Sequence, residues 1–287
     1  MRSRSFLRHS RFDEIARLMV WKALGTKGLH LIRKGPLTET PDVSRACFIF
    51  LGGLHRSGTS LVHRILRGVD GVTGFEHTGV PEDEGQHLQT VVPSARELGG
   101  PGQFAFDPRA HLTEVDAEAL GARANTLLRE WCAYLDLSKP FAVEKSPPNL
   151  TRSRFLQALF PNSAFVFITR HPVPVALATT AKWRVDLKTA FDHWGVAHAI
   201  MLEDHLHLKR VRTLRYDDFV ADPRVCLSPV FSGIGLDAEP ALEPVADADA
   251  AYFERWDRLD QPVRDGISRL MADRHGEVLD RLGYRLP

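Results

Sequence analysis

One short segment constrains this chain more than any other: a glycine loop placed directly after a strongly apolar run. Residues 46–51 read Ala-Cys-Phe-Ile-Phe-Leu, which is typical of a strand buried on both faces of a parallel sheet. Gly53 and Gly58 then bracket a loop, and apolar residues at helical spacing follow over 59–67. Because a loop of this kind directs backbone N–H groups and a helix N-terminus at one point, it predicts an anion site.

The loop departs from the nucleotide-binding pattern that it resembles most. Its glycines have the spacing of a Walker A loop, G-x-x-x-x-G-K-[ST], but Thr59 stands where the lysine belongs. That lysine reaches the β- and γ-phosphates of a nucleoside triphosphate, so its absence argues against a P-loop kinase or NTPase, which stays as an alternative. The cation lies inside the loop instead, at Arg56.

The rest of the chain alternates between apolar runs and helical patterns. Further strands are predicted at 141–143, 164–168 and 211–216. Helices are predicted at about 113–136, 149–159, 173–183, 187–209 and 249–284. This alternation favours βαβ units, and the expected fold class is α/β: a P-loop-type three-layer sandwich whose central, mainly parallel sheet is flanked by helices, with a helical C-terminal part.

The charge balance and the cysteines exclude several classes of function. Lys and Arg number 37 against 36 Asp and Glu, a formal net charge of +1, so no overall field attracts nucleic acid. Cys47, Cys132 and Cys226 have no metal-ligand spacing, and the 13 histidines form no HExxH motif. We therefore expect no metal and no disulfide framework, and the sparse cysteines favour a reducing, cytoplasmic compartment.

Residues 12–24 predict an N-terminal helix, because Ile15, Leu18 and Met19 recur at helical spacing with basic residues between them. We expect this helix to pack on the body of the protein, with weak membrane association as the alternative. No stretch reaches the roughly 20 apolar residues that span a bilayer. The Arg-rich start is not followed by the apolar core of a signal peptide.

Two motifs carry a resemblance to a known family: Arg56, Ser57, Gly58, Thr59 and Ser60 in the glycine loop, and Thr169-Arg170-His171-Pro172 at the end of a predicted strand. The loop resembles the 5′-phosphosulfate loop, [KR]-S-G-T-[ST], of the PAPS-dependent sulfotransferases (PAPS is 3′-phosphoadenosine-5′-phosphosulfate). The strand that ends Thr169-Arg170-His171-Pro172 resembles the family's 3′-phosphate segment, where an arginine forms a bidentate phosphate fork. The family's serine eight residues later is replaced by Ala178, and Thr179 and Thr180 are out of register.

Two further segments are similar to the same family, near its tyrosylprotein branch. Leu214-Arg215-Tyr216-Asp217-Asp218 is similar to a segment whose tyrosine lies against the nucleotide, which assigns that contact to Tyr216. Val143-Glu144-Lys145-Ser146-Pro147 resembles a segment whose lysine faces the sulfate, which assigns that role to Lys145. Since ligands of open α/β sheets bind at the carboxyl ends of the strands, the positions of these residues agree with the resemblance.

The resemblance implies a single sulfotransferase domain over 1–287. Its expected parts are an N-terminal helix and connector (1–44), a nucleotide-binding core (45–223) and the helical C-terminal part (224–287). The enzyme would transfer a sulfuryl group from PAPS to the hydroxyl of a small molecule or a peptide and release PAP. Lys145 and Arg56 would stabilise the leaving group, without a metal. A non-catalytic nucleotide-binding protein is a second alternative, which the departure at Ala178 favours.

The general base is expected among the acids and histidine that follow the loop helix. In tyrosylprotein-type relatives a glutamate lies about 21 residues after the loop cation, and that offset from Arg56 gives His77, with Glu76 beside it. Glu82 and Glu84 are equally open. For Glu82 the alternative is a helix first turn, where acids are favoured by the dipole.

Aromatic residues and histidines of the second half are assigned to packing. Trp183 and Trp194 are expected in the core, because they lie eleven residues apart on one helical face. The histidines of this region are expected on a solvated helix face: His193, His198, His205 and His207.

Overall fold

The computed structural model describes residues 11–24, 28, 33–238 and 248–287. Its centre is a five-stranded sheet in the order β2-β3-β1-β4-β5. The strands are β1 Cys47–Gly52, β2 Val72–Gly74, β3 Phe141–Lys145, β4 Ser163–Thr169 and β5 Val211–Arg215. All four strand pairs are parallel, which confirms the predicted parallel sheet. Their carboxyl ends therefore lie along one edge.

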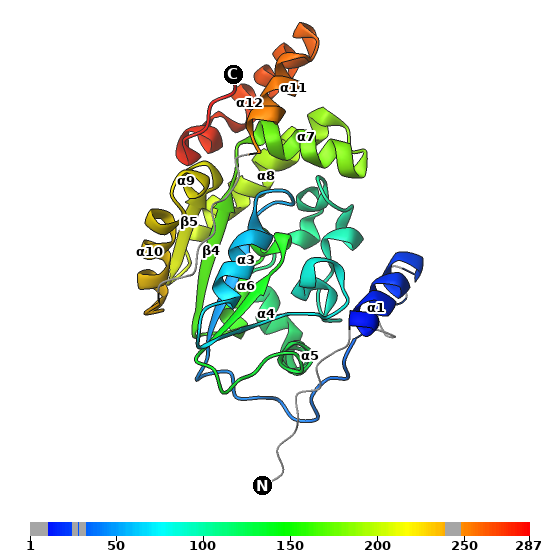
Figure 1. The fold of residues 1–287 in the computed structure, drawn as a ribbon, viewed down its shortest axis with the longest axis vertical. Helices are drawn as coiled ribbons and strands as arrows, with labels where there is room; N and C mark the ends of the chain where they lie inside the picture. The colour runs from blue at the N-terminus through cyan, green and yellow to red at the C-terminus, as the bar shows by residue number, and fades with distance from the viewer. Residues whose placement is uncertain (1–10, 25–27, 29–32, 239–247) are drawn as a thin grey trace.

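Helices pack on both faces of the sheet, as Figure 1 shows. The α-helices are α1 Arg11–Leu24, α3 Thr59–Arg67, α4 Glu114–Leu120, α5 Ala124–Cys132, α6 Ser153–Leu159, α7 Pro172–Trp183, α8 Leu187–His205, α9 Tyr216–Ala221, α10 Pro223–Ile234, α11 Ala250–Asp257 and α12 Gln261–Leu282. Short 3₁₀ turns are η2 Pro81–Asp83, η3 Gly85–His87, η4 Ala95–Leu98, η5 Phe104–Phe106, η6 Pro108–Ala110, η7 Gly121–Arg123 and η8 Pro147–Thr151.

Alternate side chains of β1 point to opposite faces of the sheet, which explains the three layers. Phe48 and Phe50 point into a core shared with α5, α6, α7 and α8. Cys47, Ile49 and Leu51 point into a second core, shared with α3 and α10. Every residue of β1 is buried, so the strand has no solvated face and must be apolar throughout. The predicted three-layer α/β sandwich is confirmed.

Some predicted boundaries differ from the structure. The helix predicted over 113–136 is divided into α4, η7 and α5, because Gly121 ends α4 with a φ of +52° and breaks the helical run. The pattern expected over 149–159 begins with the turn η8, and α6 itself starts at Ser153. The edge strand β2 has three residues and was not among the predicted strands.

The N-terminal helix α1 lies to one side of the sheet, away from the C-terminal helices (Figure 1). Val20 and Trp21 pack against the core of α5–α8, as expected for a helix packed on the body. Ile15, Leu18 and Met19 nevertheless remain exposed. Among the described residues, no helix combines the length and the apolar character needed to cross a bilayer.

Candidate active site

The glycine loop forms a turn at the carboxyl end of β1 that leads directly into α3. Arg56 and Gly58 have φ values of +74° and +93°, so the backbone is folded tightly around the loop. Gly58 is the N-cap of α3; the helix start has no capping side chain and no acidic residue in its first turn. Ser57 is buried, and its hydroxyl has no hydrogen-bond partner. These features fit a bound anion such as a phosphosulfate.

Arg170, at the end of β4, joins three segments beside this loop. Its Nη1 donates to the carbonyl of Arg56 at 2.6 Å, and its guanidinium lies 4.1 Å from the centre of the Tyr216 ring. Its Nε donates to Asp249 at 2.9 Å, and Nη2 donates to the same carboxylate. A Cβ on Gly58 would approach the Tyr216 ring to 2.7 Å, so only glycine allows this packing.

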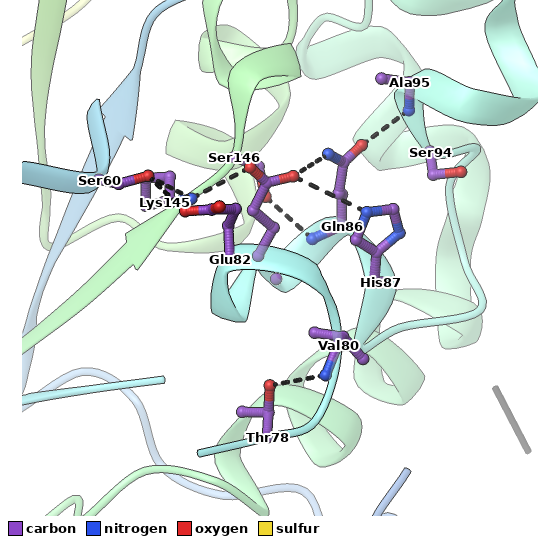
Figure 2. A network of polar contacts seen from close by, with 12 residues as sticks. Ser60, Thr78, Val80, Glu82, Gln86, His87, Ser94, Ala95, Lys145 and Ser146 are labelled. Carbon is purple, nitrogen blue, oxygen red and sulfur yellow. Dashed lines mark hydrogen bonds and ion pairs between the residues drawn. The ribbon is translucent and has the colours of Figure 1, made fainter. Parts of the chain in front are cut away.

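Lys145, at the end of β3, meets Ser60 and Glu84. Its Nζ donates to Glu84 Oε1 at 3.0 Å and to Ser60 Oγ at 3.3 Å. The ammonium group is fully buried, and Glu84 is nearly so. Ser60 Oγ in turn donates to Glu82 Oε2 at 3.0 Å. Figure 2 shows Ser60, Lys145 and Glu82 together at one end of a polar network that continues to Gln86 and His87.

Burial and neighbouring charges set the ionisation of Glu84 and of the two histidines near it, His55 and His87. Burial, the largest single effect, would raise the pKa of Glu84, but Lys145 together with His55, His87 and the Gln86 hydrogen bond offsets it, so the pKa is lowered and the carboxylate is ionised at neutral pH. Burial lowers the pKa of His55 to about 4 and that of His87 to about 4. Both imidazoles are therefore neutral at pH 7, and His55 Nδ1 has no hydrogen-bond partner.

A cavity of about 770 Å³ opens beside this pair, and Glu84 is part of its lining. Trp21 of α1 and Trp183 of α7 both line it, together with His55 and His87. The Trp21 ring lies 4.7 Å from the His87 ring, and the Trp183 ring lies 5.4 Å from the His55 ring. The cavity therefore combines aromatic and apolar walls with charged side chains, which are Glu82, Asp83, Glu84, Arg96 and Lys182.

The structure separates the four candidates for the general base. Glu82 and Glu84 line the cavity, whereas Glu76 and His77 do not. Glu76 pairs with Arg67 at 3.0 Å and lies 3.5 Å from the His77 ring. The side chains of Glu76 and His77 are 50% and 59% exposed, so they belong to the outer surface.

The positions that follow Arg170 show no direct replacement for the family's serine. Ala178 and Thr179 are buried within α7, and Thr180 Oγ1 is a buried atom without a hydrogen-bond partner. The guanidinium of Arg170 is paired with the carboxylate of Asp249. Sequence reasoning did not identify Asp249, which lies far from the motifs. In the described part of the chain, no group of three or more His, Cys, Asp or Glu residues is placed to hold a metal ion.

Glu144, which precedes Lys145, has a pKa that gives the protein a specific pH dependence. Burial raises the pKa of Glu144 to about 7, although Ser146 and Asn149 donate to its carboxylate. Because the ordinary value is 4.5, Glu144 stabilises the folded state fully below about pH 4.5, and this contribution is lost as the pH rises through about 7.

We therefore expect the difference in Tm between the wild type and Glu144→Gln to shrink as the pH rises from about 5 to about 8. Thermal unfolding followed by circular dichroism at a series of pH values measures this difference. A difference that stays constant over the range would contradict the raised pKa.

Comparisons with known proteins agree with this geometry. A family model described as "Sulfotransferase family" matches residues 49–240, which is most of the chain and includes the loop, Lys145, Arg170 and Tyr216. The chain therefore belongs to the sulfotransferase family, and it is an enzyme that transfers a sulfuryl group. The kinase or NTPase alternative is not favoured. PAPS is the donor that this family uses in general.

Individual relatives are distant. Over 257 residues the chain is 24% identical to protein-tyrosine sulfotransferase 2 of Gallus gallus, covering 83% of this chain and 67% of the relative. The sulfotransferase domain of the Synechococcus PCC 7002 olefin synthase is 20% identical, with a TM-score of 0.52, covering 87% of this chain and 99% of that domain. A sulfotransferase from Mycobacterium avium is 15% identical, with a TM-score of 0.53, covering 96% of this chain and 87% of the other. These two structures show the shared fold.

Proposed function

We propose that this enzyme uses PAPS as its donor, with the 5′-phosphosulfate at the loop and the 3′-phosphate at Arg170. Arg56, Ser57, Gly58, Thr59 and Ser60 would surround the phosphosulfate, and Tyr216 would lie against the nucleotide. The observation that carries the proposal is the Lys145–Glu84 ion pair, 3.0 Å long, which lies beside Ser60 in the first turn of α3. In this proposal the pair would supply a cation for the sulfate and a carboxylate for the acceptor, next to the anion loop.

In the proposed reaction, Glu84 takes the proton of the acceptor hydroxyl while the acceptor oxygen attacks sulfur. The bond between sulfur and the bridging phosphate oxygen breaks, and its electron pair leaves with PAP. Lys145, Arg56 and the N–H groups at the start of α3 stabilise the charge that develops on this oxygen. The acceptor leaves as a sulfate ester, and the proton remains on Glu84 until it passes to solvent.

The acceptor is proposed to occupy the cavity beside Glu84. Its volume, about 770 Å³, is in the range of sites for small organic ligands, and it also fits one side chain of a peptide. Trp21 and Trp183 favour a flat, apolar body next to the hydroxyl. The relative from Gallus gallus is by its name a protein-tyrosine sulfotransferase, so a phenolic hydroxyl is the acceptor that we would screen first.

We also propose that residues 1–287 form a single sulfotransferase domain. The basis is that the first and last described helices pack on the same body: Trp21 of α1 packs against the core that contains Phe48, and Met271 of α12 belongs to that core.

Isothermal titration with PAP tests the donor. We expect a Kd near 1 μM, roughly −8 kcal/mol, and no comparable binding of ATP with Mg²⁺. Arg170→Ala is expected to weaken PAP binding by roughly tenfold to a hundredfold, because it removes charge-assisted hydrogen bonds of about 1.5–3 kcal/mol. Equal binding of ATP, or PAP binding that survives Arg170→Ala, would argue against a sulfotransferase donor site.

The matched variant in this experiment is Asp249→Asn. Since the carboxylate of Asp249 forms an ion pair with the guanidinium of Arg170, a 3′-phosphate must compete with Asp249 for Arg170. Asp249→Asn should therefore strengthen PAP binding and leave adenosine 5′-monophosphate, which has no 3′-phosphate, unaffected. An equal change for both nucleotides would place the 3′-phosphate away from Arg170.

A further inference from the structure

We propose that Glu144 is a positioning residue for the Glu84–Lys145 pair: from the opposite face of β3, it clamps the turn that carries Glu84. This inference rests on the proposed function, in which Glu84 is the base. Glu144 does not line the cavity, so it would act through another residue and not on the substrate.

The alternation of β3 places neighbouring residues on different faces of the sheet. Val143 belongs to the core shared with α3, and Lys145 follows on the same face and reaches Ser60 of α3. Ala142 belongs to the core shared with α5–α8, and Glu144 follows on that face. The carboxylate of Glu144 is therefore buried on the side of the sheet away from the ammonium of Lys145.

The turn after Glu84 passes over the end of β3 and is bonded to Glu144. Gly85 N donates to Glu144 Oε1 at 3.1 Å, and Ser146 Oγ donates to the same oxygen at 2.6 Å. Ser146 Oγ also accepts the Gln86 N–H at 2.9 Å. Two successive backbone N–H groups are thus held, one directly and one through Ser146. Asn149 Nδ2 donates to Glu144 Oε2 at 2.6 Å and fixes the carboxylate itself.

Gly85 shows how closely the turn must approach. A Cβ at this position would lie 2.4 Å from Glu144 Oε1, so a side chain at residue 85 would displace the carboxylate. From the other side, Trp131 Nε1 donates to the Gly85 carbonyl at 2.9 Å. Both backbone polar groups of Gly85 are therefore bound by buried side chains.

Gln86 passes this constraint on to the carboxylate of Glu84. Its Nε2 donates to Glu84 Oε2 at 2.5 Å, and its Oε1 accepts the Ala95 N–H at 2.7 Å, which fixes the orientation of the amide (Figure 2). Glu84 Oε2 is thereby held by Gln86, and Oε1 by Lys145. The geometry of the pair depends on a set of bonds that ends at Glu144.

The test is a cycle of four proteins: the wild type, Glu144→Gln, Glu84→Gln and the double variant. In Glu144→Gln, an amide N–H must face either the donors of Gly85 and Ser146 or that of Asn149, so at least one of the contacts that form the clamp is lost and the clamp is weakened. We expect kcat to fall by roughly 10²-fold, as for a displaced catalytic group, with PAP affinity unchanged. In the Glu84→Gln background, Glu144→Gln should change kcat little, because residues that act as a unit are not additive.

The cycle separates the failure of this inference from that of the proposed function. Equal losses of kcat in both backgrounds, or an unchanged kcat in a folded Glu144→Gln, would overturn the positioning role. Urea unfolding of the same four proteins gives the coupling between Glu144 and Glu84 without any turnover. Coupling in stability without turnover in the wild type would overturn the proposed function and retain the contact.

Two more variants keep the test decisive. Ser146→Ala removes the bridge to Gln86 N and replaces Glu144→Gln if that protein does not fold. Glu130→Gln is the matched control, because Glu130 also accepts a backbone N–H nearby, that of Thr90 at 2.8 Å, but does not hold Glu84. It should lower stability and leave kcat unchanged, and a loss of kcat equal to that of Glu144→Gln would contradict the proposal.

Discussion

Glu84→Gln is expected to lower kcat for sulfuryl transfer by roughly 10²–10⁴-fold, the range for loss of a positioned general base. The amide keeps the size of the side chain but cannot take the acceptor proton. It also places an N–H against either Lys145 Nζ or Gln86 Nε2, which both donate to the native carboxylate. Single-turnover assays with PAPS and a phenolic acceptor measure the chemical step directly.

His77→Gln is the informative comparison, because the sequence offset favours His77 and the geometry favours Glu84. The His77 side chain is 59% exposed, so we expect kcat to stay near the wild-type value. A large loss of kcat in His77→Gln, together with an active Glu84→Gln, would assign the general base to the exposed pair Glu76 and His77. It would also reject the cavity as the acceptor site.

Lys145→Met is expected to reduce both activity and stability. Loss of a preorganised charge at the leaving group costs about 10²–10³ in kcat. Removal of one partner from a buried ion pair costs about 3–5 kcal/mol in the free energy of unfolding, because Glu84 would remain buried and charged. Stopped assays with PAPS measure the first effect, and urea unfolding measures the second.

The double variant Lys145→Met/Glu84→Gln provides the control for the stability effect. It removes the uncompensated charge, so its free energy of unfolding should recover most of the loss, while kcat remains low. If the single and double variants are equally unstable, the loss comes from packing around Lys145 and not from the ion pair.

Much of the architecture is readable from the apolar runs. β1, β3 and β4 are short, continuous and buried on both faces, which is why they stand out in the sequence. Since they are parallel, the residues that follow them had to meet at one edge, and the structure brings together Arg56, Lys145, Arg170 and Tyr216. β2 is an edge strand of three residues and is too short to give a pattern.

The choice among the acids could not be made from sequence. Residues 75–87 form consecutive turns, and His77, Glu82 and Asp83 have φ values of +51°, +55° and +50°. No periodicity describes such a segment, so counting from Arg56 does not tell which side chain reaches Lys145. Gly85 was a possible indication in the sequence, because its lack of a side chain allows Glu144 to approach. That contact joins residues far apart in the sequence, so the glycine alone does not reveal it.

Tertiary packing also overruled two local assignments. His193 and His198 were expected on a solvated face, and this was wrong: both are buried, and His193 Nε2 accepts the Ala105 N–H at 3.2 Å. The helix α8 is covered by α7 and by α12, which a pattern of single residues does not reveal. Trp194 is fully buried as expected, whereas Trp183 is partly buried and lines the cavity.

The strand order has a consequence for chain growth during synthesis. β1 pairs with β3 and β4, so Cys47 cannot pair until Phe141 has been synthesised, and Phe48 cannot pair with β4 until Ser163 has been synthesised. Contacts between residues this far apart in sequence form slowly, and parallel sheets delay them further. The glycine loop is made early, but β3 can pair with β1 only after Lys145 has emerged from the ribosome, and β4 only after Thr169 has emerged. A chain interrupted before β3 exposes an apolar strand with two open edges, which is a template for aggregation.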